Sequence, residues 1–438
     1  MGHQAGQSSR RIALIDGNSF YASCERALRP ALNGKPVIVL SNNDGCAIAR
    51  TAEAKALGIR MGDPWFKIRH LESEGLVALS ANFALYGDLS ERMMHVIGQF
   101  SPRQEIYSID ESFLDLTGVP GTGREIGTAI RSRVLQWVGI PTCVGIGPSK
   151  TLAKLANHLA KSLPRLEGVC DLSGLSHERL MRAIRHVPVA EVWGVGRRLA
   201  PRLQELGIQT AADLACADAR VLRDTFSIVM AKTARELAGE SCIAWEDSPA
   251  PKKQIMCSRS FGSPVGDIGG LMEALSVYTG RAAEKLRAQA SMTTAIHVFA
   301  RTSFFRQTPQ YSGSAVMPLG EPTDDTRVLL AATRQALRKF FRPGFAYAKA
   351  GVCLLDVQPR LEAQAQQQLA FDVQDSEADS RQVNKAMCVL DCLNTRYGRD
   401  TVKLASSVHD ETAAWQMRQE RMSPSYTTRW EDLVEVWR

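Results

Sequence analysis

The sequence predicts a multidomain α+β protein, and three observations lead to this fold class. At 438 residues the chain is too long for a single hydrophobic core, which indicates three or four domains. Its composition, 45% hydrophobic and 23% charged, is typical of a folded globular protein. Short apolar runs with strand propensity alternate with segments of helical periodicity, and residues 255–356 follow the order of a β-α-β-β-α-β domain.

The cysteine and histidine spacing, the apolar runs and the net charge limit the functions that the chain can have. The ten cysteines form no CxxC pair and the eight histidines show no ligand spacing with them, so a structural zinc site is not expected. Free thiols in this number, a polar start over residues 1–10 and the absence of a long apolar run predict a cytoplasmic location without membrane contact. The net charge is +7, and basic residues outnumber acidic ones over residues 252–349. This excess indicates a polyanionic partner, although a basic soluble surface is the simpler alternative.

The first predicted strand covers residues 11–16, an apolar run that ends in Asp16. A tight turn then leads into a helix that Asn18 or Ser19 can cap. Asp16 is therefore expected at the end of a strand.

A pair of adjacent acids interrupts residues 106–116, which otherwise read as buried β-structure. We expect Asp110 and Glu111 near a turn between strands, because a buried unpaired carboxylate costs several kcal/mol or loses its charge. If these acids meet Asp16, the two strand ends can hold two Mg²⁺ for in-line phosphoryl transfer. The alternative is a solvated hairpin turn, since spacing alone does not show that the acids meet.

Several blocks of sequence carry a family resemblance. Residues 16–25 (DGNSFYASCE) and 108–113 (SIDESF) resemble the palm signature of Y-family translesion DNA polymerases. The UmuC-type branch of that family is indicated by three further blocks, 34–46 (GKPVIVLSNNDGC), 55–66 (KALGIRMGDPWF) and 423–429 (SPSYTTR). The likeness extends over roughly residues 10–433.

The resemblance implies a right-hand polymerase with palm, fingers, a helical thumb that carries a helix-hairpin-helix, and a β-α-β-β-α-β little finger. The implied borders are 10–30 and 87–172 for the palm, 31–86 for the fingers, 173–245 for the thumb, 246–253 for a linker, 254–358 for the little finger, and 359–438 for a C-terminal tail with a clamp-binding motif and a partner-binding segment.

In the fingers, residues 46–55 are expected to start a helix rich in small side chains, with Arg50 and Lys55 available for phosphate. Relatives in other branches carry Tyr and Arg at the positions of Ala52 and Lys55, and Lys lacks the bidentate fork of Arg. The Lys-Thr at 150–151 is not a P-loop, because a Walker motif needs glycine where Val144 and Ser149 stand.

Lys154 and Lys161 are expected on one helical face, where Lys161 matches the family's triphosphate-contacting lysine. The alternative for these lysines is an ordinary solvated surface.

Residues 192–199 (VWGVGRRL), followed by Leu206-Gly207-Ile208, resemble the helix-hairpin-helix. Its glycines let backbone N–H groups approach DNA phosphates without regard to sequence, and Arg197 and Arg198 add charge attraction. The DNA-binding residues expected from the two domains are Gly194, Gly196, Arg197 and Arg198 in the thumb and Arg259, Arg301 and Arg306 in the little finger.

The expected little-finger elements are strands at 255–261, 293–301, 314–319 and 349–356 and helices at 268–290 and 324–341. Beyond them, Gln366, Leu369 and Phe371 match the QxxLxF peptides that dock on the bacterial sliding clamp. A helix near 381–395 and a run with Trp415, Trp430 and Trp437 are expected to bind partner protein. The resemblance implies processed UmuD and a RecA filament as those partners.

The implied activity is error-prone synthesis by a template-directed DNA polymerase in the SOS response, with primer-template DNA and dNTP as substrates. Asp16, Asp110 and Glu111 would be catalytic and would bind two Mg²⁺ with the Gly17 carbonyl. Tyr21 would be the steric gate against a ribose 2′-OH. The implied nucleotide-binding residues are Ser19, Phe20, Tyr21, Arg50, Lys55 and Lys161.

Two rival functions use the same features. A non-catalytic DNA-binding subunit has no use for metal-binding acids at strand ends. A nucleotidyl cyclase can use similar acids and metals but needs neither the hairpin motif nor the basic domain.

Overall fold

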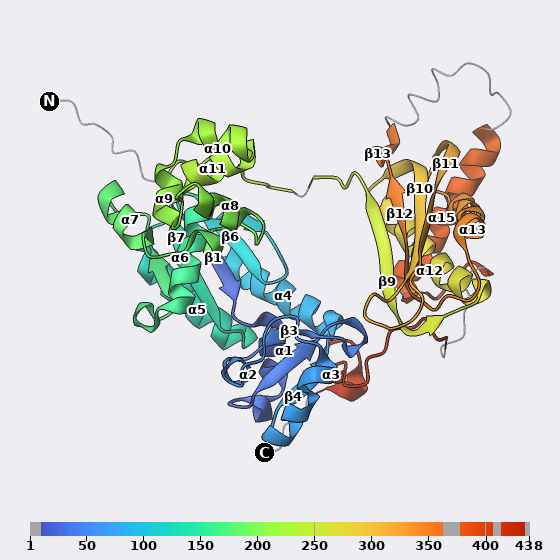
Figure 1. Cartoon of the computed structure of the whole chain (residues 1–438), viewed down its shortest axis with the longest axis horizontal. Coiled ribbons are helices and arrows are strands. Elements are labelled where there is room, and N and C mark those ends of the chain that lie inside the picture. Colours follow the sequence, from blue (N-terminus) through green and yellow to red (C-terminus); the bar gives the residue numbers. More distant parts are fainter. Residues whose placement is uncertain (1–9, 249, 362–376, 399, 406–412, 434–438) are drawn as a thin grey trace. The chain divides into compact units, whose positions relative to one another are not determined.

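The computed structural model describes residues 10–248, 250–361, 377–398, 400–405 and 413–433. The chain divides into two compact units (Figure 1). Of the described residues, the first unit comprises 10–41, 45–248 and 421–433. The second comprises Asn42–Asp44 and the described residues between Ala250 and Glu420. The predicted borders between palm, fingers and thumb all fall inside the first unit and stay predictions.

A five-stranded sheet organises the first unit, in the order β5-β6-β1-β7-β8. The central strand β1 pairs antiparallel with β6 on one side and β7 on the other, while β7 and β8 are parallel. The strand bounds are β1 Ile12–Gly17, β5 Gln104–Ile106, β6 Glu111–Asp115, β7 Thr142–Gly147 and β8 Val169–Asp171.

Strand β1 is buried on both faces, which explains its continuous apolar sequence. Ala13 and Ile15 join the core formed with α4 and α5, whereas Ile12 and Leu14 pack with Phe113 and Ala153 toward α6. Because side chains alternate along a strand, Asp16 continues the row of Ile12 and Leu14 and faces α6. The helices around the sheet are α1 Phe20–Leu28, α4 Phe83–Gly98, α5 Gly123–Val138 and α6 Lys150–Ser162.

The cap predicted for α1 is confirmed in position, at Ser19, but not in its hydrogen bond. Ser19 occupies the N-cap position in the left-handed region, with φ of 46°, and makes no side-chain cap hydrogen bond. The Ser23 hydroxyl instead donates to the Asn18 carbonyl. A Cβ at Gly17 would come within 2.9 Å of Phe20 Cδ2, so glycine lets the first turn of α1 close against the end of β1.

A smaller sheet in the order β3-β2-β4 forms the predicted fingers. The predicted helix over 46–55 is largely wrong, because residues 47–50 form a strand that pairs antiparallel with β2. Only the last part is helical, and it starts where the Thr51 side chain accepts a hydrogen bond from the Ala54 N–H. The bounds are β2 Val37–Leu40, β3 Ala47–Arg50, β4 Val77–Ser80, α2 Ala52–Ala56 and α3 Trp65–Ile68.

Residues 177–237 are helical and share a core with one face of α6 and with β7 and β8. The region has its own buried aliphatic side chains, among them Leu180, Ile184, Leu203 and Leu214. The bounds are α7 His177–Ile184, α8 Leu199–Glu205, α9 Ala211–Cys216, α10 Ala219–Thr225 and α11 Ile228–Leu237.

The second unit has the predicted β-α-β-β-α-β order, and each predicted strand and helix is present with small shifts at its ends. Its four main strands lie in the order β11-β10-β12-β9, so each crossover helix joins two strands that flank a third. Helices α12 and α13 pack against each other on one face of this sheet, as Figure 1 shows. The bounds are β9 Ile255–Val265, α12 Ile268–Ala288, β10 Ser291–Thr302, β11 Ser312–Thr323, α13 Thr326–Phe340, β12 Tyr347–Leu355 and the short β13 Gln358–Pro359.

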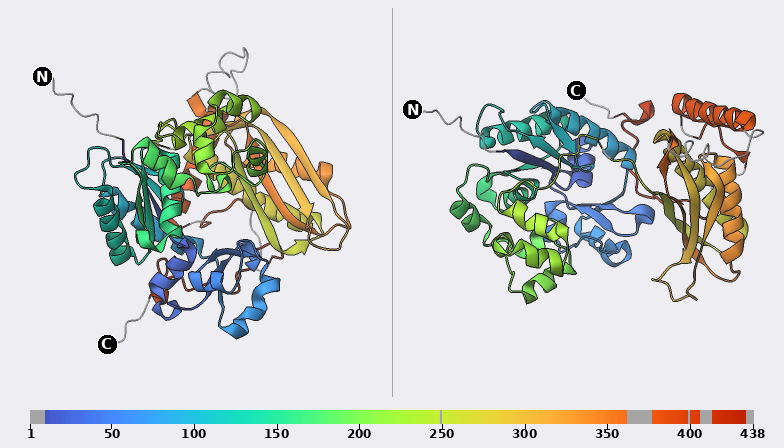
Figure 2. Two further views of the ribbon diagram at one scale, coloured as in Figure 1. Left: turned by 60° about the vertical axis from the view of Figure 1, so that its left-hand side comes forward. Right: turned by 90° about the horizontal axis from the view of Figure 1, so that it is seen from above.

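The C-terminal part of the chain contributes to both units. Helix α15, Glu377–Tyr397, belongs to the second unit, where Arg287 of α12 makes two hydrogen bonds to the Asp391 carboxylate. Trp415 is buried in the core of that unit against Tyr278, so it is not available as a free docking surface. Residues 421–433, red in Figure 2, belong to the first unit. Within the described ranges, no helix combines the length and apolarity needed to cross a bilayer.

Candidate active site

The antiparallel pairing of β1 with β6 brings the predicted acids together. Asp16 and Glu111 are direct register partners, so their side chains leave the same face of the sheet. The Gly17 N–H donates to the Asp110 carbonyl at 2.9 Å, which places Asp110 in the turn that leads into β6. The Asp110 carboxylate accepts a hydrogen bond from the Ser108 hydroxyl at 2.7 Å.

Two lysines of α6 neutralise these acids. Lys161 Nζ lies 2.6 Å from Asp16 Oδ2, and Lys154 Nζ lies 3.1 Å from Glu111 Oε1. The sequence predicted that both lysines share one helical face, and that face is turned to the acids. Both acidic side chains are mostly shielded from solvent, with 13% of Asp16 and 18% of Glu111 exposed.

Burial raises the pKa of Asp16 to about 6, and the Lys161 ammonium group opposes this increase. The charges of Glu111 and Asp110 raise the pKa of Asp16 further. Three carboxylates that repel one another in a partly buried site favour the binding of cations.

The donor set suits Mg²⁺, which prefers carboxylate and carbonyl oxygen ligands. In the parts of the chain that the structure describes, however, no group of three or more acidic, histidine or cysteine side chains is gathered closely enough to hold an ion. Asp16 and Glu111 instead point to lysines, so ion binding requires these side chains to turn from their ammonium partners.

Aromatic rings surround Lys154. Its Nζ lies 4.4 Å from the centre of the Tyr107 ring and 4.9 Å from that of Trp193, and the two rings meet edge to face. Such cation–π contacts hold the ammonium group beside Glu111. Trp193 belongs to the predicted hairpin motif, so that motif also forms part of the wall of the acidic site.

Tyr21, the predicted steric gate, is the half-buried second residue of α1. Its ring stacks on Tyr86 of α4, with centroids 4.7 Å apart and an interplanar angle of 17°. Phe83 meets it edge to face at 6.0 Å. Phe20, predicted to contact nucleotide, is only 3% exposed and belongs to the core, from which it touches the Tyr21 ring.

Arg50 and Lys161 lie near enough to Lys55 for their charges to act on it. Burial lowers the pKa of Lys55, and the charges of Arg50 and Lys161 lower it further. Arg50 also donates to the Ile59 carbonyl at 2.8 Å. A cluster of like charges of this kind can take an anion such as a triphosphate.

The predicted hairpin residues lie at the surface. Gly194, Gly196, Arg197 and Arg198 are all exposed, between a 3₁₀ turn at Val189–Glu191 and α8. Gly194 has φ of +88°, in the left-handed region that favours glycine.

The three predicted little-finger arginines do not share one face. Arg301 pairs with Lys349 in the β10–β12 register, so both side chains lie on the sheet face opposite α12 and α13. Arg259 pairs with the buried Ala350. Burial raises the pKa of Tyr278 in α12, and the charge of Arg259 opposes this increase. The Arg259 side chain therefore lies on the helix side of the sheet. Arg306 is exposed in the turn between β10 and β11. Sequence reasoning missed Lys349, which strand alternation alone could have indicated.

The predicted clamp-binding residues Gln366, Leu369 and Phe371 lie outside the described residues.

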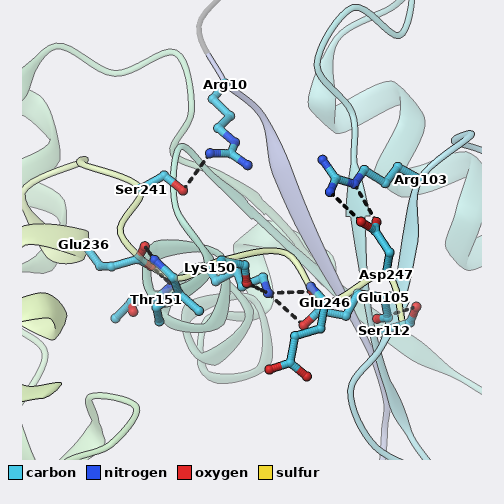
Figure 3. Close-up of polar contacts among 12 residues, drawn as sticks. Arg10, Arg103, Glu105, Ser112, Lys150, Thr151, Glu236, Ser241, Glu246 and Asp247 are labelled. Atoms are coloured by element: carbon cyan, nitrogen blue, oxygen red, sulfur yellow. Dashed lines mark hydrogen bonds and ion pairs between the residues drawn. The ribbon is translucent and has the colours of Figure 1, made fainter. Parts of the chain in front are cut away.

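Sequence reasoning also missed a buried ion pair next to the site, shown in Figure 3. Lys150 Nζ contacts both oxygens of Glu105, at 2.7 and 2.6 Å, and donates to the Ala244 carbonyl at 2.7 Å. The Glu246 N–H donates to Glu105 Oε2 at 2.8 Å. These bonds attach the segment after α11 to the first turn of α6 and to β5. A charged residue inside a helical pattern, with no partner nearby in sequence, gave no signal of this role.

Replacing Lys150 with Met is expected to destabilise the first unit by about 3–5 kcal/mol, because it leaves the Glu105 carboxylate buried without a counter-charge. Urea unfolding followed by tryptophan fluorescence measures the loss. Arg124→Met is the matched control, since its ion pair with Glu167 is exposed and contributes about 0–1 kcal/mol. Equal midpoints for the two variants would contradict this role of Lys150.

Comparisons with known proteins agree with the fold. The family model described as "impB/mucB/samB family" matches residues 15–158, and the model of its C-terminal domain matches residues 252–371. The helix-hairpin-helix model of the same family matches residues 177–208. A domain of unknown function matches residues 384–436.

Similar relatives cover nearly the whole chain. Protein ImpB of Salmonella typhimurium is 44% identical over 426 residues, which are 96% of this chain and 98% of ImpB. Protein UmuC of Salmonella typhimurium is 44% identical over 430 residues, 97% of this chain and 100% of UmuC. Among solved structures, a Y-family polymerase chimera of Dbh and Dpo4 matches with a TM-score of 0.61 at 23% identity, over 79% of this chain and 99% of the chimera. The chain therefore belongs to the impB/mucB/samB family, as a UmuC-type member of the Y-family DNA polymerases.

Proposed function

We propose that this DNA polymerase performs error-prone translesion synthesis opposite damaged template in the SOS response, by two-metal nucleotidyl transfer. The observation that carries the proposal is the register pairing of Asp16 with Glu111, beside the turn that holds Asp110. Acids from two distant stretches of sequence thereby share one partly buried site.

Asp16, Asp110 and Glu111, with the Gly17 carbonyl, would hold two Mg²⁺. When bound, these ions would activate the primer 3′-hydroxyl and neutralise the charge of the triphosphate and the leaving pyrophosphate. Lys161 and Lys154 would exchange their carboxylate partners for the incoming nucleotide, and Lys161 would then join Arg50 and Lys55 on the phosphates. Ser19 lies at the start of α1, three residues after Asp16, and would help to orient the nucleotide.

Tyr21 would place its ring where a ribose 2′-OH has to lie and would so select deoxyribose. Small side chains in the fingers, including Cys46 and Ala52, would contact the nascent pair loosely and tolerate a lesion. Ala47 is 0% exposed in the core of the smaller sheet, so it is not available for this contact. DNA would be held by the exposed hairpin glycines and by Arg197 and Arg198, through phosphates and without sequence preference.

In the second unit, Arg301 and Lys349 present charge on the sheet face that no helix of the β-α-β-β-α-β domain covers, and Arg306 adds to it from the turn. We propose this face as the contact with duplex DNA. The proposed protein partners are the sliding clamp, through Gln366, Leu369 and Phe371, processed UmuD and a RecA filament. The proposed location is the cytoplasm, at the nucleoid.

A primer-extension gel tests the function directly. The full-length protein, with a primed template, dNTP and Mg²⁺, should add deoxynucleotides to the primer, including opposite an abasic site. A scaffold would bind the DNA without extending it, and a cyclase would consume nucleotide without needing a primer. Extension that stops before every lesion would contradict the translesion role but not polymerase activity.

A further inference from the structure

Hydrogen bonds connect a C-terminal segment to the side chains that pack behind Tyr21, the proposed steric gate. Ser423 is 3% exposed, and its hydroxyl donates to Glu25 Oε1 at 3.1 Å. The Tyr86 hydroxyl donates to the same oxygen at 2.7 Å. Since the Tyr86 ring stacks on Tyr21, a continuous chain of contacts links Ser423 to the gate.

All the side chains behind the gate are buried. Glu25 and Tyr86 are both 0% exposed, so the carboxylate depends on hydrogen bonds from the protein. Its second oxygen, Oε2, has no hydrogen-bond partner among the described residues. Burial raises the pKa of Glu25, and the hydrogen bonds from Tyr86 and Ser423 oppose that increase. The two hydroxyl donors therefore hold Glu25 in place.

Hydrogen bonds from the end of β4 and the start of α4 hold the segment that carries Ser423. Ser80 at the end of β4 bridges to Met422, and its N–H donates to the Arg421 carbonyl at 3.0 Å. The Asn82 amide, whose side chain caps α4, donates to the Ser423 hydroxyl at 3.1 Å. The Ser423 hydroxyl thus accepts from Asn82 and donates to Glu25, which leaves it one favourable orientation.

Contacts of Arg421 and Tyr426, on either side of Ser423, add to this attachment. Arg421 pairs with Glu72 at 2.5 Å and lies over the ring of Trp65 at 4.8 Å. Tyr426 packs against the main core of the first unit. The segment is therefore an integral part of the unit that carries the acids.

We propose that residues 421–432 form a structural part of the sugar-selection site, in which Ser423 and Glu25 position Tyr86 as the rigid platform for Tyr21. The proposal rests on the gate assigned to Tyr21 under the proposed function. It gives a role to part of the matched domain of unknown function. Ser423, Glu25 and Tyr86 are positioning residues, because they act on the substrate only through Tyr21.

The Ser423 hydroxyl is expected to affect sugar selection because it limits how far the Tyr86 ring can move. Without the Ser423 hydroxyl, Glu25 loses one of its two side-chain donors and can shift, and the Tyr86 hydroxyl then loses its fixed acceptor. The ring that supports Tyr21 becomes freer to tilt, so Tyr21 can yield to a ribose 2′-OH. Incorporation of a deoxynucleotide does not press on the gate and is less affected.

The test is the ratio of kcat/KM for dNTP to kcat/KM for the matching rNTP, measured by primer extension with the full chain. Ser423→Ala and Tyr86→Phe should each lower this ratio about two- to tenfold, the range expected for one hydrogen bond. The double variant should lower it no further than the stronger single change, because both remove links of one chain. Ser423→Thr keeps the hydroxyl and should restore the ratio.

Ser425→Ala is the matched control, because Ser425 lies in the same segment but meets Asp432 through its backbone N–H. It should leave the ratio unchanged. Equal losses of dNTP and rNTP incorporation in Ser423→Ala, or additive effects in the double variant, would overturn the proposal.

Tyr21→Ala separates this proposal from the gate itself. If Tyr21→Ala lowers the ratio while Ser423→Ala and Tyr86→Phe leave it unchanged, the gate stands and the role of the C-terminal segment is refuted. If Tyr21→Ala leaves the ratio unchanged, the gate itself is refuted.

Discussion

Asp110→Ala is expected to lower primer extension about a thousandfold while binding of primer-template DNA stays nearly intact. The change removes one of the carboxylates proposed to hold Mg²⁺, and it leaves untouched the exposed glycines and arginines proposed to bind DNA. Single-turnover extension at saturating Mg²⁺ measures the chemical step, and fluorescence anisotropy with a labelled primer-template measures binding.

Two further variants sharpen this experiment. Asp110→Asn preserves the volume of the side chain but not its charge, so it should be nearly as inactive as Asp110→Ala. Asp115→Ala changes an acid at the other end of β6, where its carboxylate accepts from the Thr117 N–H, and should retain extension. Retained extension in both Asp110 variants would sink the assignment of the metal site.

Tyr21→Ala is expected to raise ribonucleotide incorporation relative to deoxynucleotide incorporation about 10- to 100-fold. A 2′-OH forced against a packed ring costs about 1–3 kcal/mol, and removing the ring removes that cost. The Tyr21 ring is held from three sides, by Tyr86, Phe83 and Phe20, so it cannot move aside at little cost. Steady-state kinetics with paired dNTP and rNTP substrates give the ratio.

Tyr21→Phe is the matched control for the gate, because it keeps the ring and its stacking on Tyr86. It should discriminate against ribose nearly as well as the unchanged protein. Unchanged sugar selection in Tyr21→Ala would argue that some other group reads the sugar.

Hydrophobic periodicity predicted most helices and strands, because each kind of element buries side chains at its own regular spacing along the chain. The strands and helices over 255–356 were recognisable from alternation and helical periodicity, and the structure confirms their order. The fingers show where this reasoning fails. Ala47, Ala49 and Arg50 suit a helix by propensity, but pairing with β2 overrides that preference and makes residues 47–50 a strand.

The sequence by itself determined the order of elements, the placement of Asp16, Asp110 and Glu111 at strand ends, and the family. Only the tertiary structure decided that Asp16 lies opposite Glu111, that Lys150 neutralises Glu105 inside the first unit, and that Ser423 stands behind Tyr86. The physical reason is the range of the interactions. The periodicity of apolar residues indicates which side chains face the core. Strand register, buried ion pairs and the packing of a C-terminal segment on α1 and α4 depend on contacts between residues far apart in the sequence, so neighbouring residues do not predict them.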